Sequence, residues 1–266
     1  MAKRVELIVI DPQIDFCSPD GTLFVNGATE DMIRLAAMIK RLGNQISQIH
    51  VTLDSHHRYD VSHPIYWRNS KGEHPTPFTI ITASDVKNGV WLPVYVNNTQ
   101  KMIDYTTSLE NGGRYPLCIW PPHCLIGSPG HAVLPVLFES LFEWEERPRV
   151  VNYLTKGSNV DTEHYSAVRA EVPDPLDPST QLNTEFINPL EKADIVIWTG
   201  EAGSHCLANT GRDTVEGFSD ESFIKKSVLL TDATSPVAGF ENLQEDFIKE
   251  MTGKGMRITT TVDFDI

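Results

Sequence analysis

Short apolar runs alternate with amphipathic stretches along much of the chain. The first run, VELIVI (5–10), is continuous and β-branched, which is typical of a strand buried on both faces. Apolar residues in 29–42 recur at helical spacing, and Thr29 stands where an N-cap is expected. Residues 45–54 return to a strand pattern. The chain therefore opens with a predicted strand, helix and strand.

The same alternation returns in the second half of the chain. Strand patterns occur at 148–157, at 193–200, at the start of 227–237 and at 256–264, and helical patterns at 204–218 and 241–251. This alternation predicts an α/β fold with a doubly wound, mostly parallel sheet flanked by helices. In such sheets, ligands bind beyond the carboxyl ends of the strands. Residues at those ends are therefore the first candidates for function.

Two stretches interrupt this pattern, at about 58–119 and 171–186. The first is rich in Pro, Gly, Asn and Ser and has weak periodicity, and the second is rich in Pro. Loops of this length usually carry function or cover a site. The length of 266 residues suits one α/β domain as well as two small ones. We expect a single domain over 1–266, with these two stretches as long loop insertions.

Charge and cysteine content narrow the classes of partner. The net charge of −14 argues against a nucleic acid or an anionic membrane surface as the main partner. No apolar run approaches the roughly 20 residues of a membrane span, and the N-terminal segment has the pattern of a strand rather than a signal peptide. The four cysteines lack a CxxC pair, which does not favour a disulfide framework. We expect a cytoplasmic protein with a small-molecule partner; a homo-oligomer is compatible with this.

Chemically reactive residue types follow four of the predicted strands. Asp11, Asp54 and Lys156 end the first three, and Cys206 follows the fourth at the start of a predicted helix. Because parallel strands end at the same edge of a sheet, these side chains should lie close together. A buried cysteine is often only a small apolar residue, and Asp11 with Lys156 also suits an internal salt bridge. The functional interpretation makes Cys206 a nucleophile beside a base and a cation.

Histidines near the second strand indicate a metal site. Asp54 and His56 are two apart on an extended segment, so they face the same side, while His57 faces away. One carboxylate and one imidazole make half of a site for a divalent ion, although a hydrogen-bonded Asp–His pair has the same signature. A third ligand must come from elsewhere, and the candidates are His123, in the proline-stiffened loop WPPHC, and His63.

Several motifs of the chain resemble, in order, those of one family. They are DPQIDFC (11–17), LDSH (53–56), WPPHCLIGSPG (120–130), TKG followed by HYS (155–166) and GEAGSHC (200–206). Their order and context are similar to those of the nicotinamidases, a branch of the isochorismatase-like cysteine hydrolases, over residues 5 to about 240. The resemblance implies an isochorismatase-like α/β fold and a metal-assisted amidohydrolase. Such an enzyme would convert nicotinamide to nicotinate and ammonia through a thioester intermediate.

The resemblance also implies a role for each residue of the reacting centre. Asp11, Lys156 and Cys206 fall on the family's catalytic triad. The bond between Glu201 and Ala202 falls on the family's cis peptide bond. The backbone N–H groups of Ala202 and Cys206 then form the oxyanion hole that holds the charge of the tetrahedral intermediate.

A second set of matching residues implies the metal and substrate contacts. Asp54, His56 and His123 fall on the family's ligands for one divalent ion, which would be Zn, Fe or Mn. Some members have a fourth protein ligand, and His63 lies one residue off its commonest spacing. Three further residues match the substrate pocket: Phe16 and Trp120 match aromatic residues that sandwich the pyridine ring, and Tyr165 matches a tyrosine of the pocket wall.

Two positions depart from the family pattern. Glu201 stands where the family usually has an apolar residue, and Ser204 stands where it has Asp. An acidic residue beside an oxyanion hole is unfavourable unless its side chain points away. Together with the long insertions, these departures leave two alternatives open. One is an isochorismatase-like hydrolase or an amidase for another small amide, and the other is a non-catalytic relative that binds a small molecule.

Overall fold

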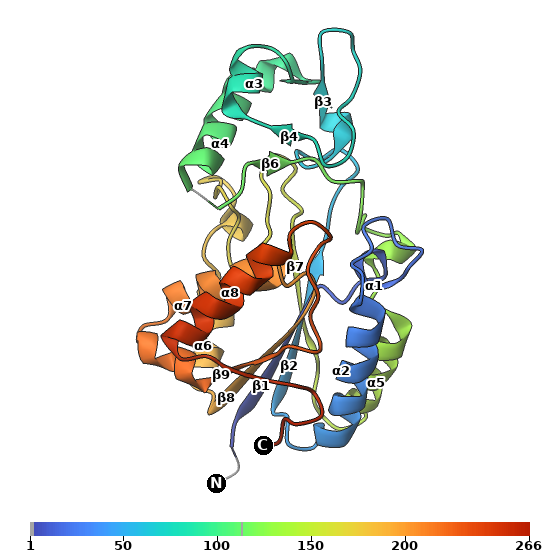
Figure 1. Ribbon diagram of the computed structural model, residues 1–266, viewed down its shortest axis with the longest axis vertical. Coiled ribbons are helices and arrows are strands. Elements are labelled where there is room, and N and C mark those ends of the chain that lie inside the picture. The colour runs from blue at the N-terminus through green and yellow to red at the C-terminus, as the bar shows by residue number, and fades with distance from the viewer. Residues whose placement is uncertain (1–2, 113) are drawn as a thin grey trace.

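Parallel strands from both halves of the chain form the central sheet of the computed structural model, which describes residues 3–112 and 114–266 (Figure 1). The strands lie in the order β10-β9-β8-β1-β2-β7, and every neighbouring pair is parallel. The apolar run of β1 is buried throughout, as expected for a strand with neighbours on both sides. The strand bounds are β1 (Val5–Ile10), β2 (Gln48–Asp54), β7 (Asn152–Lys156), β8 (Ile195–Gly200), β9 (Ser227–Leu230) and β10 (Arg257–Thr259).

The winding of the chain reverses at β1, which lies between β2 and β8. The chain runs from β1 through β2 to β7 on one side, and then crosses to β8, β9 and β10 on the other. This order confirms the predicted doubly wound parallel sheet. The carboxyl ends of β1, β2 and β8 meet at the reversal, which is where ligands of such sheets bind.

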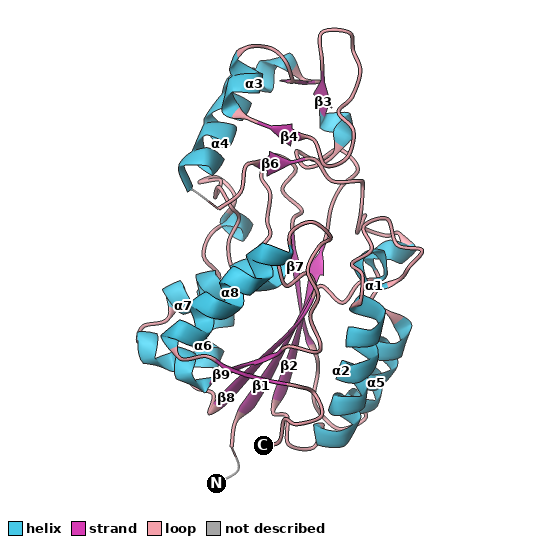
Figure 2. Ribbon diagram, viewed as in Figure 1, coloured by secondary structure: helices cyan, strands magenta, loops and turns pink. Residues whose placement is uncertain are grey.

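Helices cover both faces of the sheet (Figure 2). On one face α2 and α5 pack against each other, while α6, α7 and α8 lie on the other face. The buried residues of α2 include Met32, Leu35 and Ile39, at the three- and four-residue spacing of one helix face. The helix bounds are α1 (Ile14–Cys17), α2 (Ala28–Leu42), α5 (Pro135–Glu145), α6 (Thr184–Glu191), α7 (Cys206–Gly217) and α8 (Glu241–Lys254).

The predicted strands exist, but most of them are shorter than the apolar runs that predicted them. This holds for the strands expected at 45–54, 148–157, 193–200 and 256–264. Loop residues beyond a strand also pack into the core; Phe264, for example, is buried although β10 ends five residues earlier, at Thr259. An apolar run therefore locates a strand but overstates its length.

One helix prediction is also wrong in detail, and two of the helices that cover the sheet were not predicted. Thr29 is not the N-cap of α2, because the helix begins one residue earlier and its N-cap is Gly27. The Thr29 hydroxyl donates instead to the carbonyl oxygen of Cys17, at 2.6 Å, and so ties α2 to the end of α1. The helices α5 and α6 were not expected from the sequence, and α6 begins within the stretch 171–186 that was expected to be a loop.

The first insertion forms a small lobe of its own, which we define as residues 58–119. Its buried residues make a second apolar core that includes Tyr66, Trp67 and Met102. The expectation of long loops is wrong at 99–112, where the lobe contains a regular helix with Met102, Tyr105 and Leu109 on its buried side. The elements of the lobe are β3 (Trp67–Arg68), β4 (Ile80–Ile81), α3 (Ala83–Lys87), β5 (Leu92–Pro93), α4 (Thr99–Gly112) and β6 (Leu117–Cys118).

The chain enters and leaves the small lobe at one place, beyond the carboxyl end of β2 (Figure 1). There the backbone N–H of His56 donates to Cys124 at 3.1 Å, and the N–H of Ile126 donates back to His56 at 3.0 Å. The N–H of Trp120 also donates to the carbonyl oxygen of Ser62, at 2.8 Å. These bonds hold the segment after β2 beside the segment after β6.

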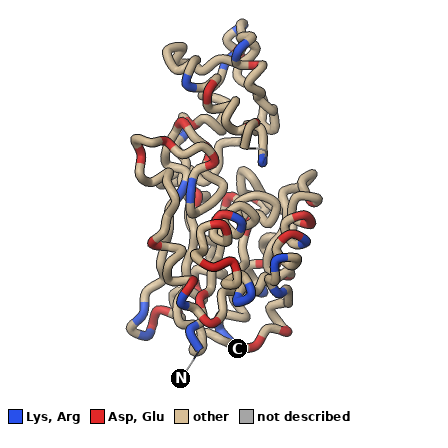
Figure 3. Tube along the Cα trace, turned by 90° about the vertical axis from the view of Figure 1, so that its left-hand side faces the viewer, with Lys and Arg blue, Asp and Glu red and all other residues tan. Residues whose placement is uncertain are grey.

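Charged residues are interspersed along the trace, acidic among basic (Figure 3). The negative charge of the sequence is therefore carried by many elements of the structure. Within the described ranges, no helix combines the length and the apolar character that crossing a membrane requires.

Candidate active site and metal site

Cys206, the candidate nucleophile, stands at the first position of α7. The loop after β8 leads into this helix, with His205 as the N-cap residue. The thiol is buried, and its Sγ lies 3.6 Å from Nζ of Lys156. The first turn of a helix presents N–H groups and a positive potential, which favour an anion there. The structure thus confirms the predicted position of Cys206, at a helix start beside a lysine.

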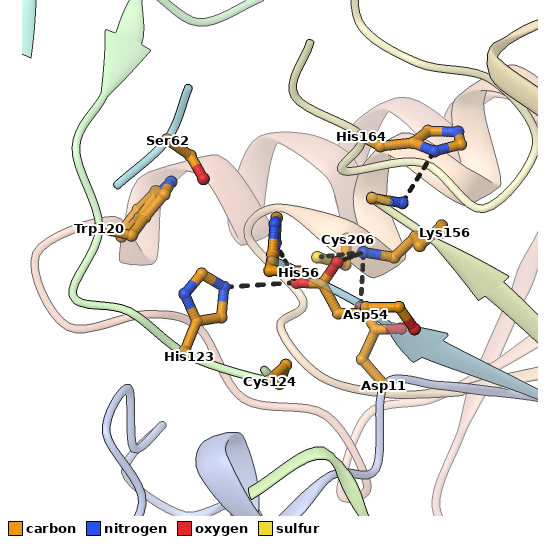
Figure 4. Close-up of polar contacts among 12 residues, drawn as sticks. Asp11, Asp54, His56, Ser62, Trp120, His123, Cys124, Lys156, His164 and Cys206 are labelled. Carbon is orange, nitrogen blue, oxygen red and sulfur yellow. Dashed lines mark hydrogen bonds and ion pairs between the residues drawn. The ribbon is translucent and has the colours of Figure 1, made fainter. Parts of the chain in front are cut away.

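Lys156 ends β7 and connects the other charged groups of the site (Figure 4). Its Nζ lies 3.0 Å from Oδ2 of Asp11 and 2.9 Å from Oδ1 of Asp54. The register of β2 on β7 pairs Asp54 with Lys156 directly. Burial lowers the pKa of Lys156, but Asp11 and Asp54 outweigh burial and raise that pKa well above its ordinary value. The buried ammonium therefore stays protonated between two carboxylates.

Asp11 follows β1 and is fully buried. The hydroxyl of Thr52 holds Asp11 in place. It accepts from the backbone N–H of Asp11 at 3.0 Å and donates to Oδ1 of the Asp11 carboxylate. Burial raises the pKa of Asp11, although Lys156 opposes this. Burial also raises the pKa of Cys206 well above its ordinary value, and the negative charge of Asp11 acts in the same direction. The resting thiol therefore keeps its proton, next to a carboxylate with a raised affinity for it.

Asp54, His56 and His123 form a compact group of candidate metal ligands. One donor atom of each lies within 4.8 Å of the others, and all three residues are buried. The Nε2 atoms of His56 and His123 lie 3.1 Å and 3.3 Å from Oδ2 of Asp54. Two imidazole nitrogens and one carboxylate oxygen suit Zn²⁺, Fe²⁺ or Mn²⁺. The structure thus brings together the three ligands expected from the sequence.

Both imidazoles of this group are oriented through their other nitrogen. Nδ1 of His56 lies 3.0 Å from Oδ2 of Asp60, and Nδ1 of His123 lies 2.8 Å from the carbonyl oxygen of Pro121. A proton on each Nδ1 satisfies these acceptors and leaves Nε2 available to a metal. The donor set and its hydrogen bonds therefore fit a divalent ion.

His63 lies beside this group but not within it. Its ring centroid is 5.1 Å from that of His56 and 5.5 Å from that of His123. Its Nδ1 bonds to the carbonyl oxygen of His57 at 3.1 Å. Burial, followed by the neighbouring imidazoles of His56 and His123, lowers the pKa of His63 to about 4, so the ring is neutral. The compact ligand group therefore has three members, and His63 is a neighbour of two of them.

A small cavity of about 30 Å³ opens between Cys206 and the ligand group. Phe16, Trp120 and Tyr165 all line it, as the sequence predicted. Trp120 is held in place by Tyr165, because its Nε1–H donates to the tyrosine oxygen at 3.0 Å. The ring of Phe16 lies 5.4 Å from that of His123. The three aromatic residues therefore lie around the space between the thiol and the metal ligands.

Two polar residues of the cavity were missed in the sequence analysis. Glu163 is buried with no hydrogen-bond partner for Oε2 among the described residues, and burial raises its pKa. His205 packs against Tyr115 and Phe240, with ring centroids at 5.0 Å and 4.9 Å, and burial lowers its pKa to about 4. The available signals were the adjacency of His205 to Cys206 and the position of Glu163 inside the HYS motif region.

Glu201 and Ser204, the two residues that depart from the family pattern, both lie in the loop between β8 and Cys206. The peptide bond between Glu201 and Ala202 is cis, which confirms that expectation, and Ala202 lines the cavity. Glu201 points away from the cavity: it is fully buried, and its Oε2 accepts from the N–H of Ser235 at 2.9 Å. Ser204 accepts from the N–H of Val237 at 3.0 Å. Both departing residues thus contact the segment after β9.

Comparisons with known proteins place the fold. No family model matches the sequence, and no curated protein matches it. Among solved structures, the yeast nicotinamidase bound to the inhibitor nicotinaldehyde is similar, with a TM-score of 0.67, 19% identity and coverage of 96% of this chain and 99% of that one. The Acinetobacter baumanii nicotinamidase/pyrazinamidase has a TM-score of 0.65 and 21% identity, over 98% of both chains.

A zinc complex is among the similar structures. The pyrazinamidase of Pyrococcus horikoshii in complex with zinc has a TM-score of 0.57 and 19% identity, over 97% of this chain and 99% of that one. At such identities the likeness establishes a shared α/β fold. The fold expected from the motifs is thereby confirmed.

Proposed function

We propose that this protein is a metal-assisted cysteine amidohydrolase that hydrolyses nicotinamide to nicotinate and ammonia. One observation carries the proposal: Asp54 belongs to two groups at once. One of its oxygens contacts Lys156, beside Asp11 and Cys206, and the other faces His56 and His123. A nucleophile and a metal site that share a carboxylate suit a substrate with a reactive amide at one end and a metal-binding nitrogen at the other. The shared fold with nicotinamidases supports this reading.

The first half of the reaction forms a thioester. Asp11 takes the proton of the Cys206 thiol, and Sγ attacks the carbonyl carbon of the carboxamide. The negative charge that develops on the carbonyl oxygen is held by the N–H groups of Ala202 and Cys206. Lys156 stays protonated throughout and keeps Asp11 in place. When the C–N bond breaks, Asp11 returns its proton to the nitrogen, and ammonia leaves.

The second half hydrolyses the thioester. A water molecule gives a proton to Asp11 as its oxygen attacks the same carbonyl carbon. The C–S bond then breaks, the carboxylic acid is released as nicotinate, and the thiol regains a proton from Asp11. One water is consumed and one ammonia is released for each turnover.

Asp54, His56 and His123 would hold the divalent ion. When bound, that ion supplies a Lewis acid for the ring nitrogen of the substrate. Phe16 and Trp120 pack against the ring, and Tyr165 closes the wall behind Trp120. Together these side chains orient the carboxamide toward Sγ of Cys206. The choice among Zn²⁺, Fe²⁺ and Mn²⁺ is left open by a mixed carboxylate and imidazole set.

A second candidate is hydrolysis of another small aromatic amide. The observation that favours it is the polar lining contributed by Glu163 and His205, which a plain pyridine ring does not need. The non-catalytic alternative has less support, because all three triad residues are present and in contact.

Ammonia release from a panel of amides tests the proposal. Nicotinamide and pyrazinamide carry a ring nitrogen, whereas benzamide has the same shape without one. We expect fast release from nicotinamide and none from the Cys206→Ala variant. Faster turnover of an amide without a ring nitrogen would overturn the nicotinamide assignment in favour of the second candidate. No release from any amide would overturn the enzymatic assignment itself.

A further inference from the structure

Glu201 has an environment that is unusual for an acidic residue. It lies five residues before Cys206 in the loop after β8, and it is 0% exposed. No Lys or Arg forms an ion pair with it among the described residues. Its Oε2 accepts one hydrogen bond, from the N–H of Ser235. Its Oε1 has no hydrogen-bond partner among the described residues. A bare carboxylate in such a place would be very costly.

A second carboxyl group, that of Asp31 on α2, lies close to Glu201, because Ser235 donates to both of them, through its N–H and its hydroxyl. Asp31 is itself 2% exposed. Its Oδ1 accepts from Arg34 at 2.5 Å, and its Oδ2 accepts from the hydroxyl of Ser235 at 2.6 Å. Two buried carboxyl groups this close together cannot both be ionised without a large cost, because burial disfavours each charge and like charges repel. One member of the pair therefore holds a proton.

The partners of each carboxyl group decide where the proton sits. Asp31 has an arginine and a hydroxyl as donors, both of which stabilise the ionised form. Glu201 has only one backbone donor. Burial and the charge of Asp31 raise the pKa of Glu201 well above its ordinary value. Glu201 is therefore the protonated member of the pair.

Ser235 joins this pair to the segment that lines the cavity. Its N–H and hydroxyl bond to Glu201 and Asp31, and its carbonyl oxygen accepts from the N–H of Gly203 at 2.9 Å. Gly27 leaves the room for this, because a Cβ there would stand 2.7 Å from the Ser235 hydroxyl oxygen. The segment 235–237 is thereby fixed on the loop that leads to Cys206.

The same segment reaches the cavity two residues later. Val237 lines the cavity beside Cys206, and its N–H is bonded to Ser204. Displacing Ser235 would move Val237 and release Gly203 and Ser204 from their partners. The hydrogen bond between Glu201 and Ser235 thus acts on the cavity wall and on the nucleophile loop without touching the substrate.

We propose that Glu201, in its protonated form, is a positioning residue that ties the segment 235–237 to the nucleophile loop, and that loss of its proton destabilises this arrangement by placing a second negative charge beside Asp31. The consequence for turnover rests on the proposed function, whereas the consequence for stability does not. The titratable and charged groups that face Glu201 are Asp31 and Arg34 on α2, with Asp232 beside Arg34, and Cys17 on α1.

The sign of the pH effect follows from the raised pKa of Glu201. Its contribution to stability is complete below the ordinary pKa of a glutamate and is lost as pH rises towards its value in the folded protein. Over that interval the unfolded chain releases a proton that the folded chain keeps. The unfolding equilibrium constant then increases by up to about tenfold for each pH unit from this one group.

Urea unfolding of three proteins across pH 5 to 9 tests the proposal. Glu201→Gln has the shape of the protonated residue: its oxygen can accept from Ser235, and its amide places no charge beside Asp31. We expect its stability relative to wild type to increase steadily with pH. Glu245→Gln removes the same charge at an exposed position of α8 and should run parallel to wild type. If Glu201→Gln also runs parallel to wild type, the proposal is wrong.

Kinetics separate a positioning role from a merely structural one. Glu201→Leu keeps the burial but removes the hydrogen bond to Ser235, and should lower kcat by about tenfold or more by leaving the buried Ser235 N–H unpaired. Glu201→Gln should recover most of that loss. Equal losses in both variants would overturn the proposal. If neither wild type nor variants release ammonia but the pH-dependent stability difference is present, the proposed function fails while the role of Glu201 stands.

Discussion

The two halves of the candidate site are positioned by different parts of the molecule. Asp11 is the first residue after β1, and Lys156 is the last residue of β7. The register of the parallel strands therefore sets the distance between these two side chains. His56 and His123 instead lie where the chain enters and leaves the small lobe, and backbone bonds between these two segments set theirs. The nucleophile half therefore depends on the main sheet, and the metal half depends on a junction of loops.

Asp54 is the exception, because it belongs to both halves. It ends β2, pairs in register with Lys156 and faces both imidazoles. Burial raises its pKa, but His56 and Lys156 outweigh burial and hold it well below the ordinary value. This difference between the halves predicts different kinds of damage. Changes in the nucleophile half should remove the chemistry, whereas changes in the metal half should mainly weaken substrate binding.

The largest effect should come from Cys206→Ala. Turnover should fall by more than about 10⁴-fold, because the nucleophile is gone and the rest of the triad cannot act without it. Folding and ligand binding should persist, since the change removes only one sulfur atom. Ammonia release and circular dichroism would measure this, and iodoacetamide should label Cys206 ahead of the three other buried cysteines. Full activity in the alanine variant would contradict the covalent mechanism.

Asp11→Asn should have the next largest effect. The amide keeps the shape of Asp11 but cannot take the thiol proton, so kcat should fall by about 10²–10⁴-fold. Because the Asp11 pKa is raised, wild-type kcat/KM should also decline at acidic pH as the carboxylate becomes protonated, and the variant should lack this limb. A loss of less than about tenfold would mean that another base does this work.

Lys156→Ala should damage both activity and stability. It leaves the carboxylates of Asp11 and Asp54 close together without their shared counter-charge, which costs about 3–5 kcal/mol in comparable buried pairs. Urea unfolding would measure this loss. Adding Asp11→Asn to the variant should restore part of the stability, because one of the two uncompensated charges is then removed. Further loss in the double variant would contradict the charge account.

His123→Ala should affect the metal half alone. We expect weaker metal binding and a higher KM for nicotinamide, with the rate of Cys206 alkylation changed by less than about threefold, since the ion does not make the nucleophile. Chelator treatment of the wild type should mimic the variant. Elemental analysis should find about one divalent ion per chain in the untreated protein. A large drop in alkylation rate would show that the two halves are not separable.

Asp60→Ala should have the smallest effect. Asp60 contacts one of the three candidate metal ligands, His56, at its Nδ1. Loss of the Asp60 carboxylate therefore leaves the His56 ring free to rotate but removes no ligand. Such indirect partners are worth about 10–100-fold in metal affinity. Competition with a chromogenic chelator would measure this. Unchanged affinity would mean that the backbone bonds of His56 alone orient its ring.

The sequence predicts the nucleophile half well for a physical reason. Continuous apolar runs mark buried parallel strands, and their carboxyl ends are placed together by the sheet, so Asp11, Asp54 and Lys156 could be grouped in advance. The small lobe escaped prediction because α4 has few apolar residues and lies between Pro- and Gly-rich stretches. In α5, Phe138 and Phe142 are exposed, so apolar residues are not confined to one face and the helical period is obscured.

The missed residues of the cavity have a common cause. Glu163 and His205 lie on irregular segments, where residue spacing does not determine the direction of a side chain. The partners of Glu201 also come from α2 and from the segment after β9, far away in the sequence. Contacts of this kind become visible only when the chain is folded.

The most direct test of the account is the ratio of nicotinamide to benzamide hydrolysis before and after metal removal. The two amides share the reacting group and differ in the ring nitrogen that the Asp54, His56 and His123 group should recognise through its ion. We expect a strong preference for nicotinamide, its loss on chelation and its return on adding the ion back. An undiminished preference in the metal-free protein would contradict the assignment of these three residues to substrate recognition.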